Sequence, residues 1–577
     1  MILQALTSLY EALAQKGEIS KEGWSREKIS FALGIDENGD LLRITPLFET
    51  VDGPKGKTRE VPQKMTVPIK VGHTSPKFLW GNSGFILGTA NDKTPEAAKD
   101  CFKRNRDLHH EVLKGIEVPA AKAILSFFDR WEPEKTLENE LVTSCAGELL
   151  GKANMVFRFN GKFIHEIPQL AAAWQAHYGE TAKERGQCLI TGALDAIPNT
   201  HPLIKGVQGA QSSGAALVSF NASAFCSYNK EQNQNAPVGK YAAFAYTAAL
   251  NHLLADRKNV HRIGDAAVVC WAENADKQYE EFAADLFFGD GDGDQSDEQR
   301  LSALQASVEL LAKGLPCREL DLDPERKFYI LGISPNAARL AVRFFYCDSF
   351  GNIVKNIKAH YDRLEIVRPS YDKYPMLPLW KLLSATVNPS AKDKTPNSAM
   401  AGAVARAVFS GGRYPASLLE CTFLRIRAER EITRERAAII KAYYLRNPNE
   451  KCPKEVLTVS LNKDSKNVPY TLGRLFSVYE EIQQAANPGI NTTIKDKYFG
   501  SAATMPATVF PILSSLAQKH LRKLSDAQRV YLDKKVMTLK SVLGEQYPAH
   551  MSLPEQGSFD LGYYHQTQAR YTKKEDK

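Results

Sequence analysis

The sequence has no closely spaced cysteine pair and no long apolar run. Its nine cysteines stand singly, without a CxxC pair, so neither a zinc ribbon nor a thioredoxin-like site is indicated. An odd number of scattered cysteines in a large chain fits a reducing cytosol, and we expect a cytoplasmic protein. No apolar stretch reaches the roughly 18–20 residues that span a bilayer. The opening MILQALTSLYEALAQ lacks a basic start and has helical apolar spacing, which predicts an amphipathic helix rather than a signal peptide.

Motifs for catalysis and metal binding are also missing, since neither HExxH nor GxSxG occurs. Segment 147–153 has one residue too few between its glycines for a phosphate-binding loop. The aspartates of 290–294 alternate as in a calcium loop, but the glycine and glutamate of that loop are absent. His109 and His110 would point about 100° apart on a helix, which does not suit one metal ion. We expect no metal, no cofactor and no enzymatic activity, although a triad assembled from distant residues stays open.

What is present indicates a globular protein of more than one domain. The 577 residues exceed the roughly 250–300 at which a single core stops growing. Strand-like and helical patterns mix up to residue 376, and strands almost vanish beyond it. We predict an α+β fold, with a large mixed α/β N-terminal domain (1–376) followed by a C-terminal helical bundle (377–577).

Periodicity places several elements within this scheme. Expected strands are 29–35, 41–48, 156–159, 187–191, 266–271, 328–333 and 340–346. Expected helices are 170–178, 241–255, 418–445, 472–486, 507–524 and 526–543. The Gly/Pro/Lys-rich stretch 53–77 is expected to be a projecting hairpin or a plain surface loop, because it can bury little.

Positive charge is concentrated at the C-terminal end. Residues 451–577 carry 18 lysines and arginines against 12 aspartates and glutamates, so most of the net charge of +8 lies in this last fifth. Like charge gathered in one module can attract phosphate, and an ordinary solvated surface is the equally weighted alternative.

A polar loop at 206–214 contains Gln211, Ser212 and Ser213 among glycines. Small polar side chains beside glycine present backbone N–H groups, amides and hydroxyls at close range, which suits contact with phosphate or base edges. Asn221 follows shortly after and adds another amide. Composition alone favours the alternative, an ordinary loop that precedes a strand.

Segments along the whole chain together resemble one protein family. They are, in order, MILQAL, KISFAL, FLWGNSGFILG, GAQSSGAALVSFNASAF, NAPVGKYAAFAYTAALNHLL, WAENADK, LGISPNAARLAVRFF, GGRYPASLLE, AAIIKAYYLRN, PYTLGRLFSVYEEIQ, KDKYFGSAATMPATVFP and EQGSFDLGYYHQ. The sequence is similar in these segments to the large subunit of the type I-C CRISPR surveillance complex, Cascade. The resemblance runs from residue 1 to about residue 566.

The resemblance implies a non-catalytic role in RNA-guided defence. CRISPR RNA pairs with the target DNA and supplies sequence specificity, while protein reads a short adjacent motif, the PAM, in the duplex. In this family the large subunit performs that reading, aids unwinding and R-loop formation, and recruits a helicase-nuclease. Its other implied partners are the Cascade backbone subunits and a small subunit made separately from its own C-terminal region. We expect such a fragment to start near Val459, and no membrane partner.

Under this resemblance the basic and polar features become candidate nucleic-acid contacts. Lys70 and Lys77 are candidates beside the PAM. Gln211, Ser212, Ser213 and Asn221 are candidates for base-edge or phosphate contact in the minor groove. The candidates for holding single-stranded DNA by charge are Lys519, Arg522, Lys523, Lys534 and Lys535.

Two other functions remain open from the residues themselves. A stand-alone basic nucleic-acid-binding protein would bind duplex without partners and with steep salt dependence. A cytosolic enzyme with an unrecognised site would show activity in the purified monomer.

Overall fold

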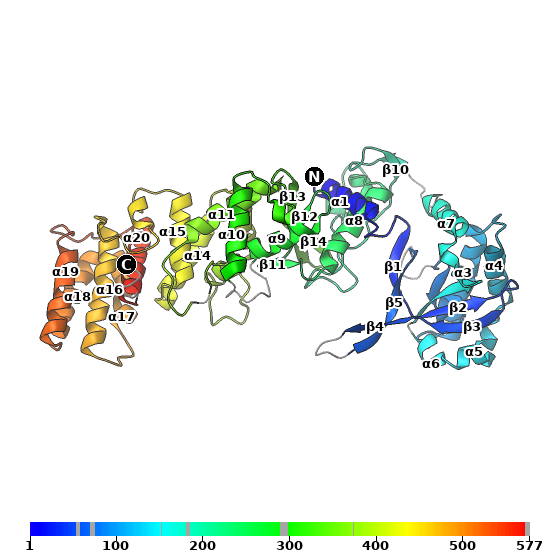
Figure 1. Cartoon of the computed structure of the whole chain (residues 1–577), viewed down its shortest axis with the longest axis horizontal. Coiled ribbons are helices and arrows are strands. Elements are labelled where there is room, and N and C mark those ends of the chain that lie inside the picture. Colours follow the sequence, from blue (N-terminus) through cyan, green and yellow to red (C-terminus); the bar gives the residue numbers. More distant parts are fainter. Residues whose placement is uncertain are drawn as a thin grey trace. The chain divides into compact units, whose positions relative to one another are not determined.

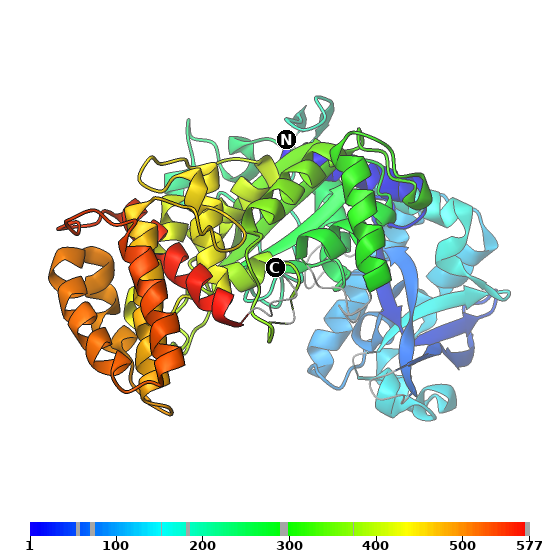
Figure 2. The ribbon, with the colours of Figure 1, turned by 60° about the vertical axis from the view of Figure 1, so that its left-hand side comes forward.

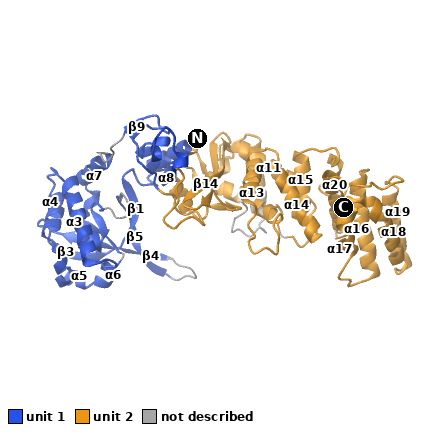
Figure 3. Ribbon diagram, turned by 180° about the vertical axis from the view of Figure 1, so that it is seen from behind, with its two compact units in different colours: residues 1, 3–202, 219–249 blue, residues 2, 203–218, 250–577 orange. Residues whose placement is uncertain are grey.

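A computed structural model describes residues 1–52, 58–69, 76–151, 153–180, 185–288, 298–372 and 374–571. The chain forms two compact units (Figure 3). Unit 1 contains residues 1, 3–202 and 219–249, and unit 2 contains residues 2, 203–218 and 250–577. The predicted α+β class is confirmed, because several sheets lie in the N-terminal part and helices make up the C-terminal part. The functional division at residue 376 stays a prediction.

Unit 1 combines a mixed sheet, a β-ribbon and helices. Its strands are β1 (Trp24–Ile29), β2 (Phe31–Ile35), β3 (Leu41–Pro46), β4 (Phe48–Asp52), β5 (Thr58–Pro68), β6 (Trp80–Asn82), β7 (Asn154–Phe159), β8 (Lys162–Phe163), β9 (Arg185–Gln187) and β10 (Leu194–Ala196). Its helices are α1 (Ile2–Gln15), α2 (Ser83–Ile86), α3 (Pro95–Val112), α4 (Pro119–Arg130), α5 (Glu140–Thr143), α6 (Ala146–Leu149), α7 (Pro168–Glu180) and most of α8 (Lys240–Ala255).

The central sheet of unit 1 has the order β3-β2-β7-β6, with β2 and β7 parallel (Figure 1). Alternate residues of a strand point to opposite faces of the sheet. Phe31 and Leu33 therefore pack with Phe127 of α4 in one core. Ala32 of β2 and Val156 of β7 belong to a second core on the other side.

That second core is closed by a ribbon of β1 and β5, which pair antiparallel (Figure 1). Ile29 of β1 and Met65 and Val67 of β5 are buried there. Strand β4 pairs with β5, so the part of the stretch 53–77 that forms β5 belongs to a hairpin, one of the two expectations; residues 53–57 and 70–75 lie outside the described residues. Lys70 lies outside the described residues.

Unit 2 begins with an antiparallel sheet of order β11-β12-β13-β14. Its strands are β11 (His261–Ile263), β12 (Ala266–Ala272), β13 (Lys327–Asn336) and β14 (Arg339–Ser349). Its helices are α9 (Lys277–Ala283), α10 (Glu298–Ala312), α11 (Phe350–Leu364), α12 (Leu379–Ser384), α13 (Ser398–Ser410), α14 (Ala416–Glu429), α15 (Arg434–Arg446), α16 (Val468–Ala486), α17 (Ile494–Thr504), α18 (Pro506–Leu521), α19 (Asp526–Lys540) and α20 (Leu553–Tyr571).

Four expected elements are wrong in detail. The strand expected over 29–35 divides between β1, which ends at Ile29, and β2, and the strand expected over 41–48 divides between β3 and β4, which begins at Phe48. The single helix over 418–445 is two helices, because Arg430 takes a left-handed conformation (φ 56°) that ends α14, and Thr433 caps the start of α15. The strand over 187–191 is absent, since β9 ends at Gln187 and a turn follows in which Cys188 N donates to Ala193 O. Helices α17 and α20 were not predicted.

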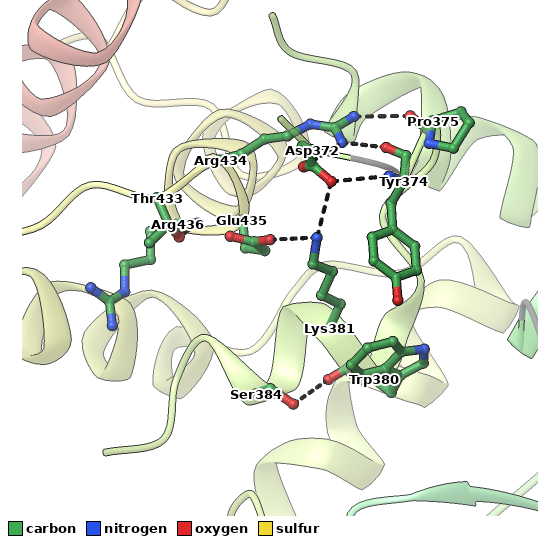
Figure 4. A network of polar contacts seen from close by, with 10 residues as sticks. All are labelled: Asp372, Tyr374, Pro375, Trp380, Lys381, Ser384, Thr433, Arg434, Glu435 and Arg436. Carbon is green, nitrogen blue, oxygen red and sulfur yellow. Dashed lines mark hydrogen bonds and ion pairs between the residues drawn. The ribbon is translucent and has the colours of Figure 1, made fainter. Parts of the chain in front are cut away.

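A segment between α11 and α12 is fastened to α15 by a buried ionic network (Figure 4). Arg434 Nη1 lies 3.0 Å from Asp372 Oδ2, and Arg434 Nη2 donates to Pro375 O at 2.9 Å. Lys381 Nζ bridges Asp372 Oδ1 at 3.3 Å and Glu435 Oε1 at 3.0 Å. Burial works to raise the pKa of Asp372, but the hydrogen bond from Tyr374 N and the Arg434 guanidinium hold it below its usual value. The predicted boundary at 376 thus falls in a tightly held connection.

The helices α16 and α20 lie side by side (Figures 1 and 2). Glycines form their contact. A Cβ added at Gly562 would lie 2.1 Å from Tyr470 O, and one added at Gly473 would lie 1.9 Å from Phe559 O. Polar groups then pair across the contact: Glu480 Oε2 accepts from Tyr563 OH at 2.6 Å. Only glycine allows this approach, so the glycines determine how the C-terminal helix packs.

We predict that Gly562→Ala lowers the free energy of unfolding by about 1–3 kcal/mol or more, because the added methyl group collides with backbone rather than with a movable side chain. Denaturant unfolding followed by circular dichroism measures the change. Gly500→Ala in α17 is the matched control: a Cβ there meets nothing within 4 Å, so helix propensity should make it neutral or stabilising. Equal effects of the two substitutions would contradict the close approach.

His109 of α3 is fully buried in unit 1 and holds the segment before β6. Its Nε2 accepts from Leu79 N at 2.9 Å, so Nδ1 carries the proton and donates to Asn105 O at 2.7 Å. Burial lowers the pKa of the imidazole to about 4. The ring is therefore a neutral structural group, which agrees with the expectation that the histidine pair does not bind metal.

A pH dependence follows from this depressed pKa. Between pH 6.5 and 4 the unfolded chain binds a proton at His109 that the folded chain does not, so stability falls as pH falls. From pH 7 to pH 5 the loss is about 2 kcal/mol. Hydrogen exchange of the peptide containing Leu79 measures it. His109→Gln should reduce the dependence, while His110→Gln, exposed on the same helix, should keep it; an unchanged dependence in His109→Gln would contradict the assignment.

Candidate nucleic-acid interface

An open groove of about 630 Å³ runs along the outer face of the β1–β5 ribbon in unit 1. It is lined by Arg26, Glu27, Lys28, Ser30, Pro62, Lys64 and Asn154. The inner face of the same ribbon is buried in the core, so strand alternation turns Arg26, Lys28 and Lys64 outward together. The groove therefore carries three cations against the single carboxylate Glu27, which gives it a net positive surface.

The two lysines of this groove lie directly opposite each other. Lys28 of β1 pairs in register with Lys64 of β5, and both side chains are exposed. Like charges directly opposite on neighbouring strands destabilise the pairing. Within the described ranges, no ion pair or hydrogen bond engages the side chain of Arg26, Lys28 or Lys64. These cations are thus available to an external anion.

Lys77 extends the same surface. Its Nζ lies 3.4 Å from Asn154 Oδ1 and 4.3 Å from the centre of the Trp80 ring. The amide of Asn154, one of the groove residues, donates to Lys28 O at 3.1 Å. The structure therefore brings Lys77, a candidate from the sequence, to the edge of the groove, where it is half-buried and held by contacts.

The loop candidates lie elsewhere. Gln211, Ser212 and Ser213 are exposed in a turn of unit 2, where Gly214 N donates to Gln211 O at 2.9 Å and Gly214 has φ +107°. The turn is closed by a bridge between Ile204 and Ala215. Asn221 is exposed in a part of the chain assigned to unit 1. The expected loop exists, and it belongs to a different compact unit from Lys77.

The bundle candidates differ in how they are paired. Lys535 Nζ lies 3.2 Å from Glu481 Oε1 and 4.4 Å from the centre of the Tyr531 ring. Lys523 Nζ donates to Asn487 Oδ1 at 3.3 Å. Lys519, Arg522 and Lys534 are exposed, and no ion pair joins them to another described residue. Lys535 is thus largely neutralised by a structural partner.

The described residues offer little for other chemistry. No group of three or more His, Cys, Asp or Glu side chains that could hold a metal ion occurs among them. Within the same ranges, no helix combines the length and apolarity needed to cross a membrane.

Comparison with known proteins identifies the family of this chain. The sequence model described as CRISPR-associated protein (Cas_Csd1) matches residues 6–571. The chain belongs to this CRISPR-associated family. A search of curated proteins gave no match. The match covers almost the whole chain, so both compact units belong to the family's domain.

Arg26 and Lys28 were missed from the sequence. We expected a strand to start at residue 29, and the strand β1 begins at Trp24. The segment gives no strand signal of its own, because Trp24 and Ile29 are its only apolar residues and lie five positions apart. Its pairing with β5 determines the strand. Lys64 had been noted only as part of the basic stretch.

We predict opposite effects on binding and on stability for the groove lysines. Lys28→Ala or Lys64→Ala should weaken DNA binding at every sequence and reduce the slope of log K against log salt by about one. The same substitutions should raise the free energy of unfolding by about 0.2–1 kcal/mol, because they remove the opposed charges. Binding titrations at several salt concentrations and denaturant unfolding measure the two effects.

Lys122→Ala is the control for this prediction. Lys122 of α4 carries the same charge but already pairs with Glu117 Oε2 at 2.6 Å. Its loss should leave the salt slope unchanged and should not stabilise the fold. A loss of binding equal to that of Lys28→Ala would show that total charge, and not the groove, attracts DNA.

Proposed function

We propose that this Csd1-family protein is the large, non-catalytic subunit of a type I-C CRISPR surveillance complex, which contacts duplex DNA beside the PAM. The observation that carries the proposal is the row of unpaired cations on the β1–β5 ribbon. Family membership supports a role in CRISPR defence. The resemblance stated above supplies the type and the subunit.

The ribbon cations and the loop amides have different roles in this proposal. Lysine and arginine contacts to phosphate fix position on the duplex but carry no sequence information. Arg26, Lys28, Lys64 and Lys77 therefore position the DNA, and we assign Lys70 to the same contact. Base edges are read by hydrogen-bonding groups, which we assign to Gln211, Ser212, Ser213 and Asn221. Reading and holding are then separable by mutation.

The helical part of unit 2 holds the displaced single strand in this proposal. Lys519, Arg522 and Lys534 contribute most, because each is exposed and unpaired among the described residues. Lys523 and Lys535 contribute less, since each must leave an existing partner. The same part, made separately, supplies a small subunit, and the assembled complex with its guide RNA and backbone subunits recruits a helicase-nuclease.

A stand-alone DNA-binding protein is the second candidate. One feature of the ribbon groove favours it, because the groove cations can bind phosphate without a partner subunit. Binding by charge alone would be independent of the PAM and of the guide.

We predict that PAM dependence appears only in the assembly. A guide-matched duplex with correct or scrambled PAM is titrated with the free protein and then with the protein assembled with guide RNA and backbone subunits. The free protein should bind both duplexes weakly and equally, whereas the assembly should prefer the correct PAM. Gln211→Ala should cost the assembly about 1–3 kcal/mol of that preference, and Lys28→Ala should weaken both duplexes alike.

Each contrary result points to a different error. Full, PAM-independent binding by the free protein would favour the stand-alone candidate. An assembly that keeps its affinity in Lys70→Ala and its PAM preference in Gln211→Ala would show that other residues contact the DNA and read the motif.

A further inference from the structure

A second cavity, of about 730 Å³, lies beside the basic groove in unit 1. It is lined by Tyr10, Ala14, Gly17, Glu18, Ile19, Ser20, Lys21, Glu22, Trp24, Arg26, Thr66, Ala171, Gln175 and Tyr241. Its volume is within the usual range of small-molecule sites. Arg26 lines both the cavity and the basic groove, so the two hollows adjoin at this residue of strand β1.

The walls of this cavity are held in place by specific contacts. Trp174 Nε1 of α7 donates to Gly23 O at 2.7 Å, and Trp24 Nε1 donates to Gln175 Oε1 at 3.2 Å. Tyr10 OH donates to Ser20 O at 3.1 Å, which joins α1 to the segment before β1. The cavity is therefore preformed, and little ordering opposes the entry of a ligand.

The lining combines aromatic rings with hydrogen-bonding groups. Trp24, Tyr10 and Tyr241 contribute rings, and Tyr10 and Tyr241 meet edge to face with their centres 6.1 Å apart. Gln175 and Thr66 add an amide and a hydroxyl. Aromatic faces that stack on a planar ring, with amides and hydroxyls for its polar edge, are how proteins bind unstacked bases.

The charges divide the site into a base pocket and a phosphate path. In the cavity Glu18 and Glu22 are balanced by Lys21 and Arg26, whereas in the groove Arg26, Lys28 and Lys64 are opposed only by Glu27. Burial raises the pKa of Glu22, while Lys240 opposes and Asp195 adds to that shift. The excess positive charge of the groove attracts phosphate more strongly than the balanced cavity does, so an uncharged base fits the cavity and its phosphates fit the groove.

We propose that the cavity receives a single unpaired nucleobase of a DNA strand whose phosphates lie along Arg26, Lys28 and Lys64. The proposal rests on the proposed function, which brings opened duplex to this ribbon. It adds a base-binding site to a surface that would otherwise only attract phosphate. Trapping one base outside the stack would favour the opened over the closed duplex.

The test uses the full-length protein and a duplex that contains one unpaired 2-aminopurine. Ala171→Phe places a ring in the cavity from α7, and Ala172→Phe, at the exposed neighbouring position that does not line the cavity, is the matched control. We expect Ala171→Phe to weaken binding of this duplex about tenfold, within the range of one stacked base, and to leave the fully paired duplex unchanged. Quenching of 2-aminopurine by the wild type should disappear in Ala171→Phe and persist in Ala172→Phe.

Two further measurements separate the sources of error. Unchanged binding of the fully paired duplex by Ala171→Phe would show that its loss reflects a blocked base and not a misfolded unit. Trp24→Phe keeps a ring and should retain most of the binding of the unpaired base. If Lys28→Ala weakens both duplexes but Ala171→Phe and Ala172→Phe behave alike, the base site is wrong and the groove stands. If Lys28→Ala has no effect, the proposed function itself is at fault. Free dAMP that binds as tightly as the unpaired strand would assign the cavity to a mononucleotide and overturn the proposal.

Discussion

The register of β1 against β5 is the constraint on which the candidate interface depends. Strand alternation in this register buries Ile29, Met65 and Val67 while it turns Lys28 and Lys64 outward. Burying an apolar side chain of this size is worth about 1.5–3 kcal/mol, whereas the opposed lysines cost about 0.2–1 kcal/mol. The free energy of burying the apolar side chains therefore exceeds the cost of lysine–lysine repulsion, and this register is kept. A slip of one residue would put the lysine positions into the core, which forbids the alternative register.

In contrast to the groove cations, several cations of unit 2 are bound to acceptors within the protein. Arg434 and Lys381 lie in the network with Asp372 and Glu435 (Figure 4), and Lys441 Nζ donates to Arg363 O and Glu365 O. Breaking a buried pair typically costs 3–5 kcal/mol, because it leaves a charge uncompensated. These cations are committed to the connection between α11 and the later helices. A count of positive charge along the sequence cannot separate them from the cations of the groove.

The sequence was sufficient for the fold class and for most elements with clear periodicity, such as α8, β12, β13 and α16. It failed where the conformation of one residue, or a contact between residues distant in the sequence, determines where an element begins or ends. The left-handed Arg430 divides a continuous helical pattern, and the glycines of α20 look unfavourable for a helix until α16 is packed against them. The same limit applied to the candidate site. Lys77 could be chosen from local composition, but Arg26 and Lys28 of the groove belong to a strand that pairs with residues distant in the sequence.

Pairing, and not net charge, then indicates where nucleic acid binds most strongly. The C-terminal fifth carries most of the excess charge, yet Glu481 there contacts both Lys535 and Arg570. A cation with a partner must give up that contact to bind a phosphate, whereas an unpaired one gives up only water and counterions. The cations of the ribbon groove therefore offer more binding free energy per charge than Lys523 and Lys535 of the bundle, which already have partners. For this reason the ribbon is the first part of the chain that we expect to engage duplex DNA, and the bundle acts on a strand that is already held.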